Sequence, residues 1–157
     1  MTTLIRPLEK ALAHFDGSYL NDGELFVVEK YAKHFGTRLL TYTLLRDRAK
    51  DLVLQTLRDF ASEYPELVKK HQARCVYDLS EMLRAIANAI LHDSPQEFCD
   101  RTLDWFTTVI KGYSKTTQCA SAYGKLQKAI DKLLPPDCAN LVKPYTDLCV
   151  EHLTRGA

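Results

Sequence analysis

The sequence has no long hydrophobic run and almost no net charge. No apolar run approaches the ~20 residues that a transmembrane helix needs. Twenty-one Lys and Arg residues nearly balance 20 Asp and Glu residues, giving a net charge of +1. This balance provides no strong attraction to nucleic acid or to acidic membranes. The first residues, MTTLIRPLEK, lack a signal-peptide pattern. We therefore expect a cytoplasmic protein with no membrane insertion and no nucleic-acid partner.

Cysteine is present five times but never as a CxxC pair. An odd, dispersed set of cysteines favours neither a metal site nor a disulfide framework, so free thiols are expected. Glycine-rich phosphate loops and zinc motifs are absent as well. Cys75 and His71 form a formal thiol–base pair, but nothing supplies an oxyanion hole or a third orienting group. The sequence therefore predicts a protein that is not an enzyme.

What the sequence does contain is helical periodicity along nearly its whole length. Apolar residues recur at steps of three and four from Leu45 to Tyr64, where Pro65 ends the pattern. A central helix then buries a second apolar set: Cys75, Leu79, Met82, Leu83, Ile86 and Ile90. No alternating strand pattern or internal repeat is present. We predict one all-α domain over residues 1–157, with unequal helices packed in a globin-like bundle.

Capping residues predict where the helices begin and end. Asn21 and Glu24 make a capping box ahead of a helix that Gly36 ends or bends. Ser94 to Glu97 predicts a second capping box, opening a helix that weakens at Gly112. Further helices are expected from about Thr116 to Leu134, and from Pro144 to about Thr154.

A thiol and a carboxylate share one face of the central helix, because Cys75 and Asp78 are three residues apart. Arg74 lies beside the cysteine, and Arg84 lies further along. An ionised carboxylate can accept hydrogen bonds from two or three N–H groups, and an arginine can pair with an acidic group. The segment could therefore hold a covalently tethered cofactor with both kinds of group. A core cysteine and a plain Arg74–Asp78 helix pair are the alternatives.

Four segments, in one order along nearly the whole chain, resemble the phycobiliprotein family, closest to allophycocyanin-type subunits. They are FDGSYLNDGEL (15–25), FASEYPELV (60–68), RCVYDLSEMLR (74–84) and CDRTLDWF (99–106). The resemblance implies a globin-like bundle (35–157) preceded by an N-terminal helical hairpin (1–34) that pairs two subunits. It makes Asp16 and Arg84 candidate partners across a dimer interface, supported by Tyr19. Asp16 could instead stabilise a turn within its own chain.

The resemblance also implies a site for phycocyanobilin or another linear tetrapyrrole. Cys75 matches the thiol that forms the thioether, and Asp78 matches the carboxylate that accepts from the pyrrole N–H groups. Arg74 is placed to meet a propionate, with Tyr77 lining the site. The family's arginine before the aspartate is Tyr77 here, and only KKHQAR separates PELV from Cys75, where the family has a longer loop. A more open site and loss of the ring-shaped antenna assemblies are expected.

These departures favour an accessory protein in bilin or phycobilisome biology over a bulk antenna subunit. Such a protein would hold a bilin, or assist its synthesis, transfer or removal, as in bilin biosynthesis-associated globins. We expect a homodimer, with phycobilisome or bilin-metabolism proteins as partners. A divergent chromophorylated light-harvesting subunit is one alternative, and a ligand-free globin-like interaction or sensor module is another. Haem is not expected, because residues 95–112 contain no histidine.

Overall fold

The computed structural model describes residues 5–13 and 18–155. These residues form helices joined by short turns, without a strand, which confirms the all-α prediction. The helices are α1 (Ile5–Ala13), α2 (Asp22–Asp47), α3 (Ala49–Glu63), α4 (Pro65–His92), α5 (Pro95–Phe98), the π-helical turn η1 (Cys99–Leu103), α6 (Asp104–Gly112), α7 (Thr116–Leu133) and α8 (Pro136–Thr154).

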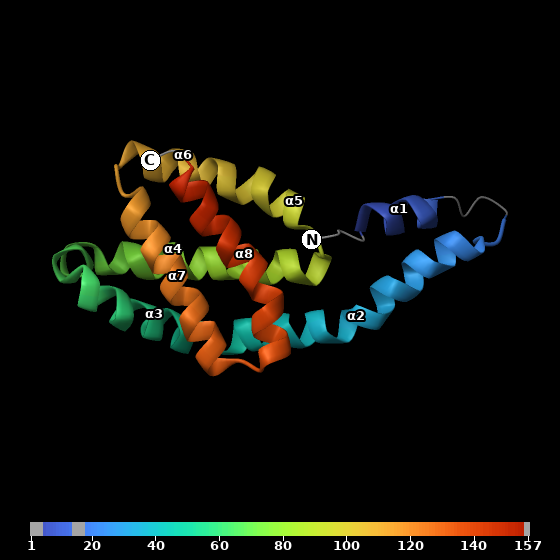
Figure 1. The fold of residues 1–157 in the computed structure, drawn as a ribbon, viewed down its shortest axis with the longest axis horizontal. Helices are drawn as coiled ribbons and strands as arrows, with labels where there is room; N and C mark the ends of the chain where they lie inside the picture. Colours follow the sequence, from blue (N-terminus) through green and yellow to red (C-terminus); the bar gives the residue numbers. More distant parts are fainter. Residues whose placement is uncertain (1–4, 14–17, 156–157) are drawn as a thin grey trace.

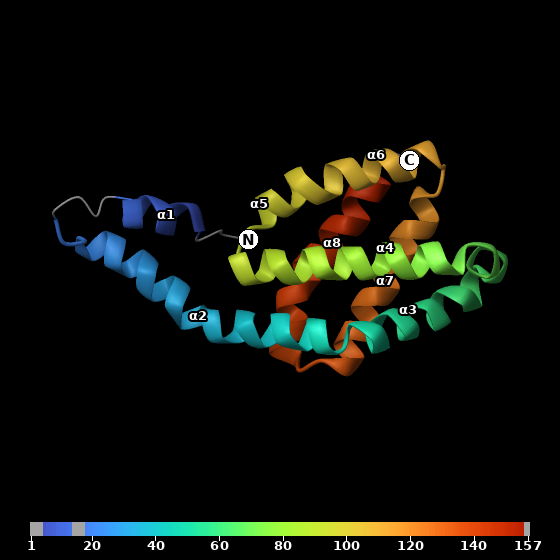
Figure 2. The ribbon, with the colours of Figure 1, turned by 180° about the vertical axis from the view of Figure 1, so that it is seen from behind.

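The first two helices form an arm that projects from the rest of the molecule (Figures 1 and 2). We define the arm as α1 together with residues 22–34 of α2; α1 packs against α2. The predicted capping box is confirmed: Asn21 Oδ1 accepts from the Glu24 amide at 3.0 Å, and Glu24 accepts from the Asn21 amide at 2.9 Å. Gly36 does not end α2, which continues to Asp47, but the helix changes direction between the arm and the body (Figures 1 and 2). The division between hairpin and globin-like part at residue 34 is therefore not marked by a helix end.

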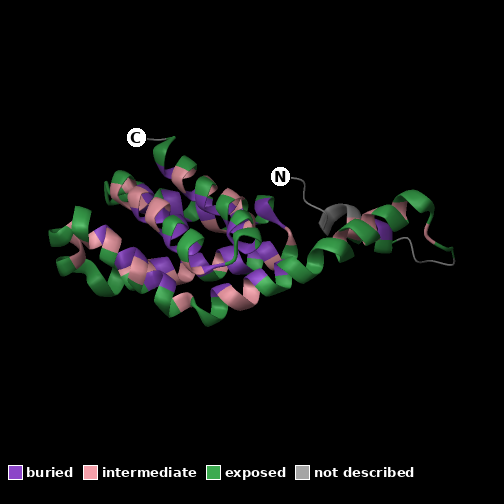
Figure 3. Ribbon diagram, turned by 60° about the horizontal axis from the view of Figure 1, so that its bottom comes forward, coloured by how far each residue is buried: buried purple, intermediate pink, exposed green. Residues whose placement is uncertain are grey.

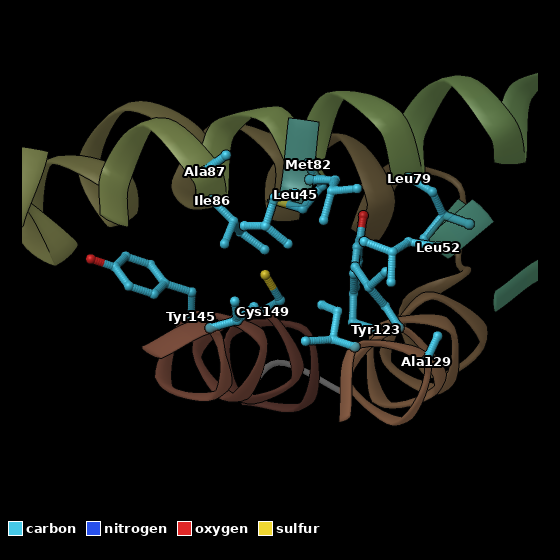
Figure 4. Packing of buried hydrophobic residues seen from close by; sticks show 14 of the residues in the cluster. Leu45, Leu52, Leu79, Met82, Ile86, Ala87, Tyr123, Ala129, Tyr145 and Cys149 are labelled. Carbon is cyan, nitrogen blue, oxygen red and sulfur yellow. The ribbon is translucent and has the colours of Figure 1, made fainter. Parts of the chain in front are cut away.

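The remaining helices pack as a globin-like body around one hydrophobic core. Helices α7 and α8 pair along their lengths, α3 packs on both α4 and α7, and the second half of α2 lies against α4 and α8. Buried residues lie on the facing sides of these helices, whereas the arm is mostly exposed (Figure 3). Figure 4 shows this core between α4 and the α7–α8 pair, with residues such as Leu45, Leu52, Met82 and Ile86.

One predicted helix start is wrong, and one predicted capping box is absent although its helix begins at Pro95 as predicted. The last helix begins at Pro136 rather than Pro144, because Pro136 occupies the first helical turn, where its missing N–H costs nothing. Pro144 lies inside α8. Ser94 makes no capping hydrogen bond with its side chain. Glu97 pairs with Arg101 at 2.8 Å instead of returning to the cap.

The helix predicted from Pro95 to Gly112 is divided into α5, η1 and α6. A π-turn has more residues per turn than an α-helix, so it changes the direction in which the following residues point. The predicted end at Gly112 and the predicted helix from Thr116 agree with the structure.

Candidate functional site

A pocket of about 340 Å³ opens between α3, α4, α6 and α7. Ligand-binding pockets commonly hold about 300–1,000 Å³, so this one lies at the small end of that range. Its walls are mostly apolar, with a few charged and thiol groups. They consist of Phe60, Leu67, His71, Arg74, Cys75, Asp78, Leu79, Phe106, Val109, Ile110, Tyr113, Lys115, Gln118, Cys119, Ala122 and Tyr123.

The α4 wall is one stripe of a helix. His71, Cys75 and Leu79 follow at steps of four residues, and Asp78 lies on the same side. Residues 69–74, where the family's longer loop is expected, are helical here. The helix is kinked at His71, whose φ of −128° and ψ of 27° depart from helical values. Residues 69–74, which stand in place of the family's longer loop, therefore supply the pocket residues His71 and Arg74.

Two aromatic rings close the inner end of the pocket. Phe106 and Tyr123 are both buried, and their ring centroids lie 5.8 Å apart in an edge-to-face arrangement. Figure 4 shows Tyr123 reaching from α7 toward α4. Burial raises the pKa of its phenol well above the usual value, with smaller contributions from nearby Cys149, Cys119, Asp78 and Cys75. The ring therefore stays neutral beside the pocket.

Three of the four residues predicted to hold a bilin line this pocket together: Arg74, Cys75 and Asp78. Arg74 Nε lies 3.0 Å from each oxygen of the Asp78 carboxylate. The carboxylate is 22% exposed, so a ligand can still reach it. Because Arg74 is 60% exposed, its guanidinium can turn to meet an acidic group outside the pocket.

Tyr77 does not line the pocket, contrary to the prediction. It follows Cys75 by two residues, which is a rotation of about 200° around an α-helix. Its ring is 58% exposed and lies beneath the Arg74 guanidinium, 5.7 Å from the ring centroid. Tyr77 can therefore help position Arg74 but cannot form a wall of this pocket.

Cys75 is half-buried rather than a core residue, which corrects the expectation that the central helix buries it. Burial is the larger cause that raises the pKa of its thiol, and the charge of the Asp78 carboxylate is a smaller one. The thiol is thus protonated at neutral pH, yet it faces an open cavity. This environment suits slow addition to a bound ligand more than fast reaction with solutes.

The residues predicted for the dimer interface are exposed where the structure describes them. Tyr19 is fully exposed. Arg84 is exposed on α4 and pairs with Glu81 of its own helix at 2.9 Å. Asp16 lies outside the described residues.

Sequence analysis missed the walls contributed by α6 and α7, including Cys119 and Tyr113. The apolar residues of both helices have helical spacing, but the sequence does not indicate which face of each helix lies toward α4 and the pocket.

Within the described part of the chain, no group of three or more His, Cys, Asp or Glu side chains could hold a metal ion. No described helix is both long and apolar enough to cross a membrane.

Comparison with known proteins agrees with this architecture. The family model described as "Phycobilisome protein" matches residues 11–153, a span that includes every helix lining the pocket. No curated protein matches the chain. Because the family model covers nearly the whole chain, the protein belongs to the phycobilisome protein family, which supports a phycobiliprotein-like role in light harvesting.

Proposed function

We propose that this protein binds a linear tetrapyrrole in the pocket between α3, α4, α6 and α7, as a non-enzymatic accessory protein in bilin or phycobilisome biology. The observation that carries the proposal is the convergence of Cys75, Asp78 and Arg74 on one largely apolar pocket. Family members generally carry linear tetrapyrroles attached through cysteine, and the pocket offers a thiol for that attachment.

Each polar residue of the pocket has a role that its chemistry allows. The Cys75 thiol would add to the ligand and form the thioether. The Asp78 carboxylate would accept hydrogen bonds from pyrrole N–H groups, and charge-assisted bonds of this kind are stronger than neutral ones. Arg74 and Lys115 would meet the propionates, Arg74 from the exposed side of α4 and Lys115 from the start of α7.

The small volume of the pocket favours a carrier or accessory role over a fully enclosed antenna chromophore. An extended tetrapyrrole would project from a pocket of this size, past Tyr113, which lines the pocket and is itself exposed. The second candidate, a divergent light-harvesting subunit, shares the same thiol and carboxylate. A ligand-free module is disfavoured, because the space beside Phe106 remains open and Trp105 is 65% exposed rather than packed into it.

Co-expression with a phycocyanobilin-producing pathway tests the proposal. Absorption spectra and zinc-induced fluorescence on a denaturing gel would compare the wild type with Cys75→Ala. Cys99→Ala is the matched control, since Cys99 is also half-buried but does not line the pocket. We expect a fluorescent band that Cys75→Ala loses and Cys99→Ala keeps. Colour lost on denaturation would indicate a non-covalent carrier, and a folded, colourless wild type would refute bilin binding.

We further propose that two copies of the chain pair through their arms. The arm exposes Leu12, Leu25 and Phe26, although it contributes little to the core of its own chain. Such an apolar surface is stabilised when a partner covers it. Arg84 would then exchange its Glu81 contact for Asp16 of a second copy, with Tyr19 at the same surface.

A further inference from the structure

A second thiol, Cys119, lines the pocket together with Cys75. Cys119 lies in the first turn of α7, and Cys75 lies on α4, so the two sulfurs come from different walls. Both residues are half-buried and both thiols are free. Cys99, Cys138 and Cys149 do not line the pocket. The pocket therefore presents two thiols to whatever occupies it.

The two thiols and the Asp78 carboxylate influence one another electrostatically. Burial raises the pKa of Cys119 to about 11, and the charges of Asp78 and Cys75 add to that rise, opposed by Lys115. Coupling of this kind requires that the groups lie near each other at low dielectric. Burial also raises the pKa of the Cys75 thiol. Cys75 is the less buried of the two thiols and matches the family's attachment residue, so we expect it to react first.

Occupation of the pocket would change the state of Cys119. A thioether at Cys75 carries no charge, and N–H donors bound to Asp78 compensate its charge. Both changes remove influences that disfavour the Cys119 thiolate, so the pKa of the second thiol falls. The second thiol is therefore activated by the arrival of the ligand at the first.

We propose that Cys119 is a second attachment residue, which forms a thioether to the same conjugated ligand after Cys75 has reacted. This inference rests on the proposed function, since it requires a ligand with two electrophilic double bonds. In each addition the sulfur–carbon bond forms as a carbon–carbon π bond breaks. The thiol hydrogen ends on the neighbouring carbon, so no oxidant is consumed and no group leaves. Helices α4 and α7 both pack on α3, which holds the two walls for a bridging ligand.

Dibromobimane tests the two-thiol geometry without a bilin. The reagent becomes fluorescent when two thiolates displace both of its bromides and one molecule bridges two sulfurs. In the folded protein at mildly alkaline pH, we expect a fluorescent adduct that joins the α4 and α7 peptides. The adduct should be lost in Cys75→Ala and in Cys119→Ala, and kept in Cys99→Ala. Single alkylation of Cys75 without a bridge in the folded wild type would overturn the proposal.

Loading with phycocyanobilin tests the ligand itself. Peptide mapping should find one bilin joined to both the α4 and the α7 peptide. Cys119→Ala and Cys119→Ser should retain the Cys75 attachment and absorb at longer wavelength, because one more double bond stays conjugated. An identical spectrum and a single attached peptide in wild type and Cys119 variants would overturn double attachment while leaving the proposed function intact. A bridged dibromobimane adduct in a protein that takes up no bilin would instead refute the proposed function and the second attachment together.

Discussion

At the scale of single residues, position on a helix decides what a side chain contributes. Leu52 and Leu54 are the same residue type on α3, two residues apart and thus about 200° apart around the helix. Leu52 is 0% exposed within the core, whereas Leu54 is 41% exposed. Burial of apolar surface stabilises the fold by roughly 25 cal/mol per Å² removed from water. Leu52 therefore contributes more to the free energy of unfolding than Leu54 does.

We predict that Leu52→Ala lowers the free energy of unfolding by about 2–5 kcal/mol, because it removes buried methyl groups and leaves a cavity. Leu54→Ala should change it by less than about 1 kcal/mol. Urea denaturation followed by circular dichroism measures both values. Equal losses in the two variants would contradict the burial of Leu52.

The candidate site shows how far residue spacing can be used. Cys75, Asp78 and Arg74 were predicted together because helical geometry brings spacings of three and four residues to one side. Tyr77 was misplaced because similarity to a family motif says nothing about the helix face on which a changed residue lies. Cys119 could not be predicted, since its approach to Cys75 depends on how α7 packs in the body.

At the scale of helices, two caps that look alike in sequence differ in structure. Asn21 and Glu24 bond each other's backbone amides at the start of α2. Ser94 instead lies buried in the α4–α5 turn, where its amide donates to the Ala89 carbonyl at 3.0 Å. The Ser94 backbone therefore completes the end of α4, and its side chain does not cap α5.

We predict that Asn21→Ala weakens the first turn of α2 by about 1 kcal/mol, within the usual range of ~0.5–2 kcal/mol for a lost N-cap. Amide hydrogen exchange at Glu24 should accelerate by roughly fivefold as local opening becomes easier. The matched variant Ser94→Ala should leave exchange in the first turn of α5 nearly unchanged. If Ser94→Ala accelerated exchange in its helix more than Asn21→Ala does in α2, the Asn21 cap would not be stabilising.

Helix boundaries were predictable where a local signal acts alone. Asn21 and Gly112 mark helix boundaries that agree with the structure. The start of α8 was missed because Pro144, a second plausible start, is tolerated inside the helix. The π-turn η1 has the sequence CDRTL, which contains no Gly or Pro to mark it, so it could not be predicted from a local signal.

At the scale of the whole molecule, the arm and the body differ in how much of their apolar surface they bury. Buried side chains concentrate in the body, and the arm presents large apolar residues to solvent (Figure 3). A surface of this kind is characteristic of proteins that associate.

We predict that Phe26→Glu weakens self-association by about tenfold or more, because Phe26 is 63% exposed on the arm and a charge there opposes an apolar contact. Light scattering coupled to size-exclusion chromatography would follow the dimer as concentration falls. Leu54→Glu, an exposed apolar position on α3 outside the arm, is the control and should stay dimeric. A wild type that is monomeric at all concentrations would refute pairing through the arms.

The unbroken course of α2 sets the orientation of any partner held by the arm. An α-helix advances about 1.5 Å and turns about 100° per residue, so arm and body share one helical phase. One residue inserted in the exposed stretch near Gly36 would swing the arm's apolar surface about a quarter turn while barely changing its reach. Four inserted residues would nearly restore the facing direction and lengthen the arm by about 6 Å. The number of residues in α2 therefore sets the angle at which a partner bound to the arm is held relative to the body.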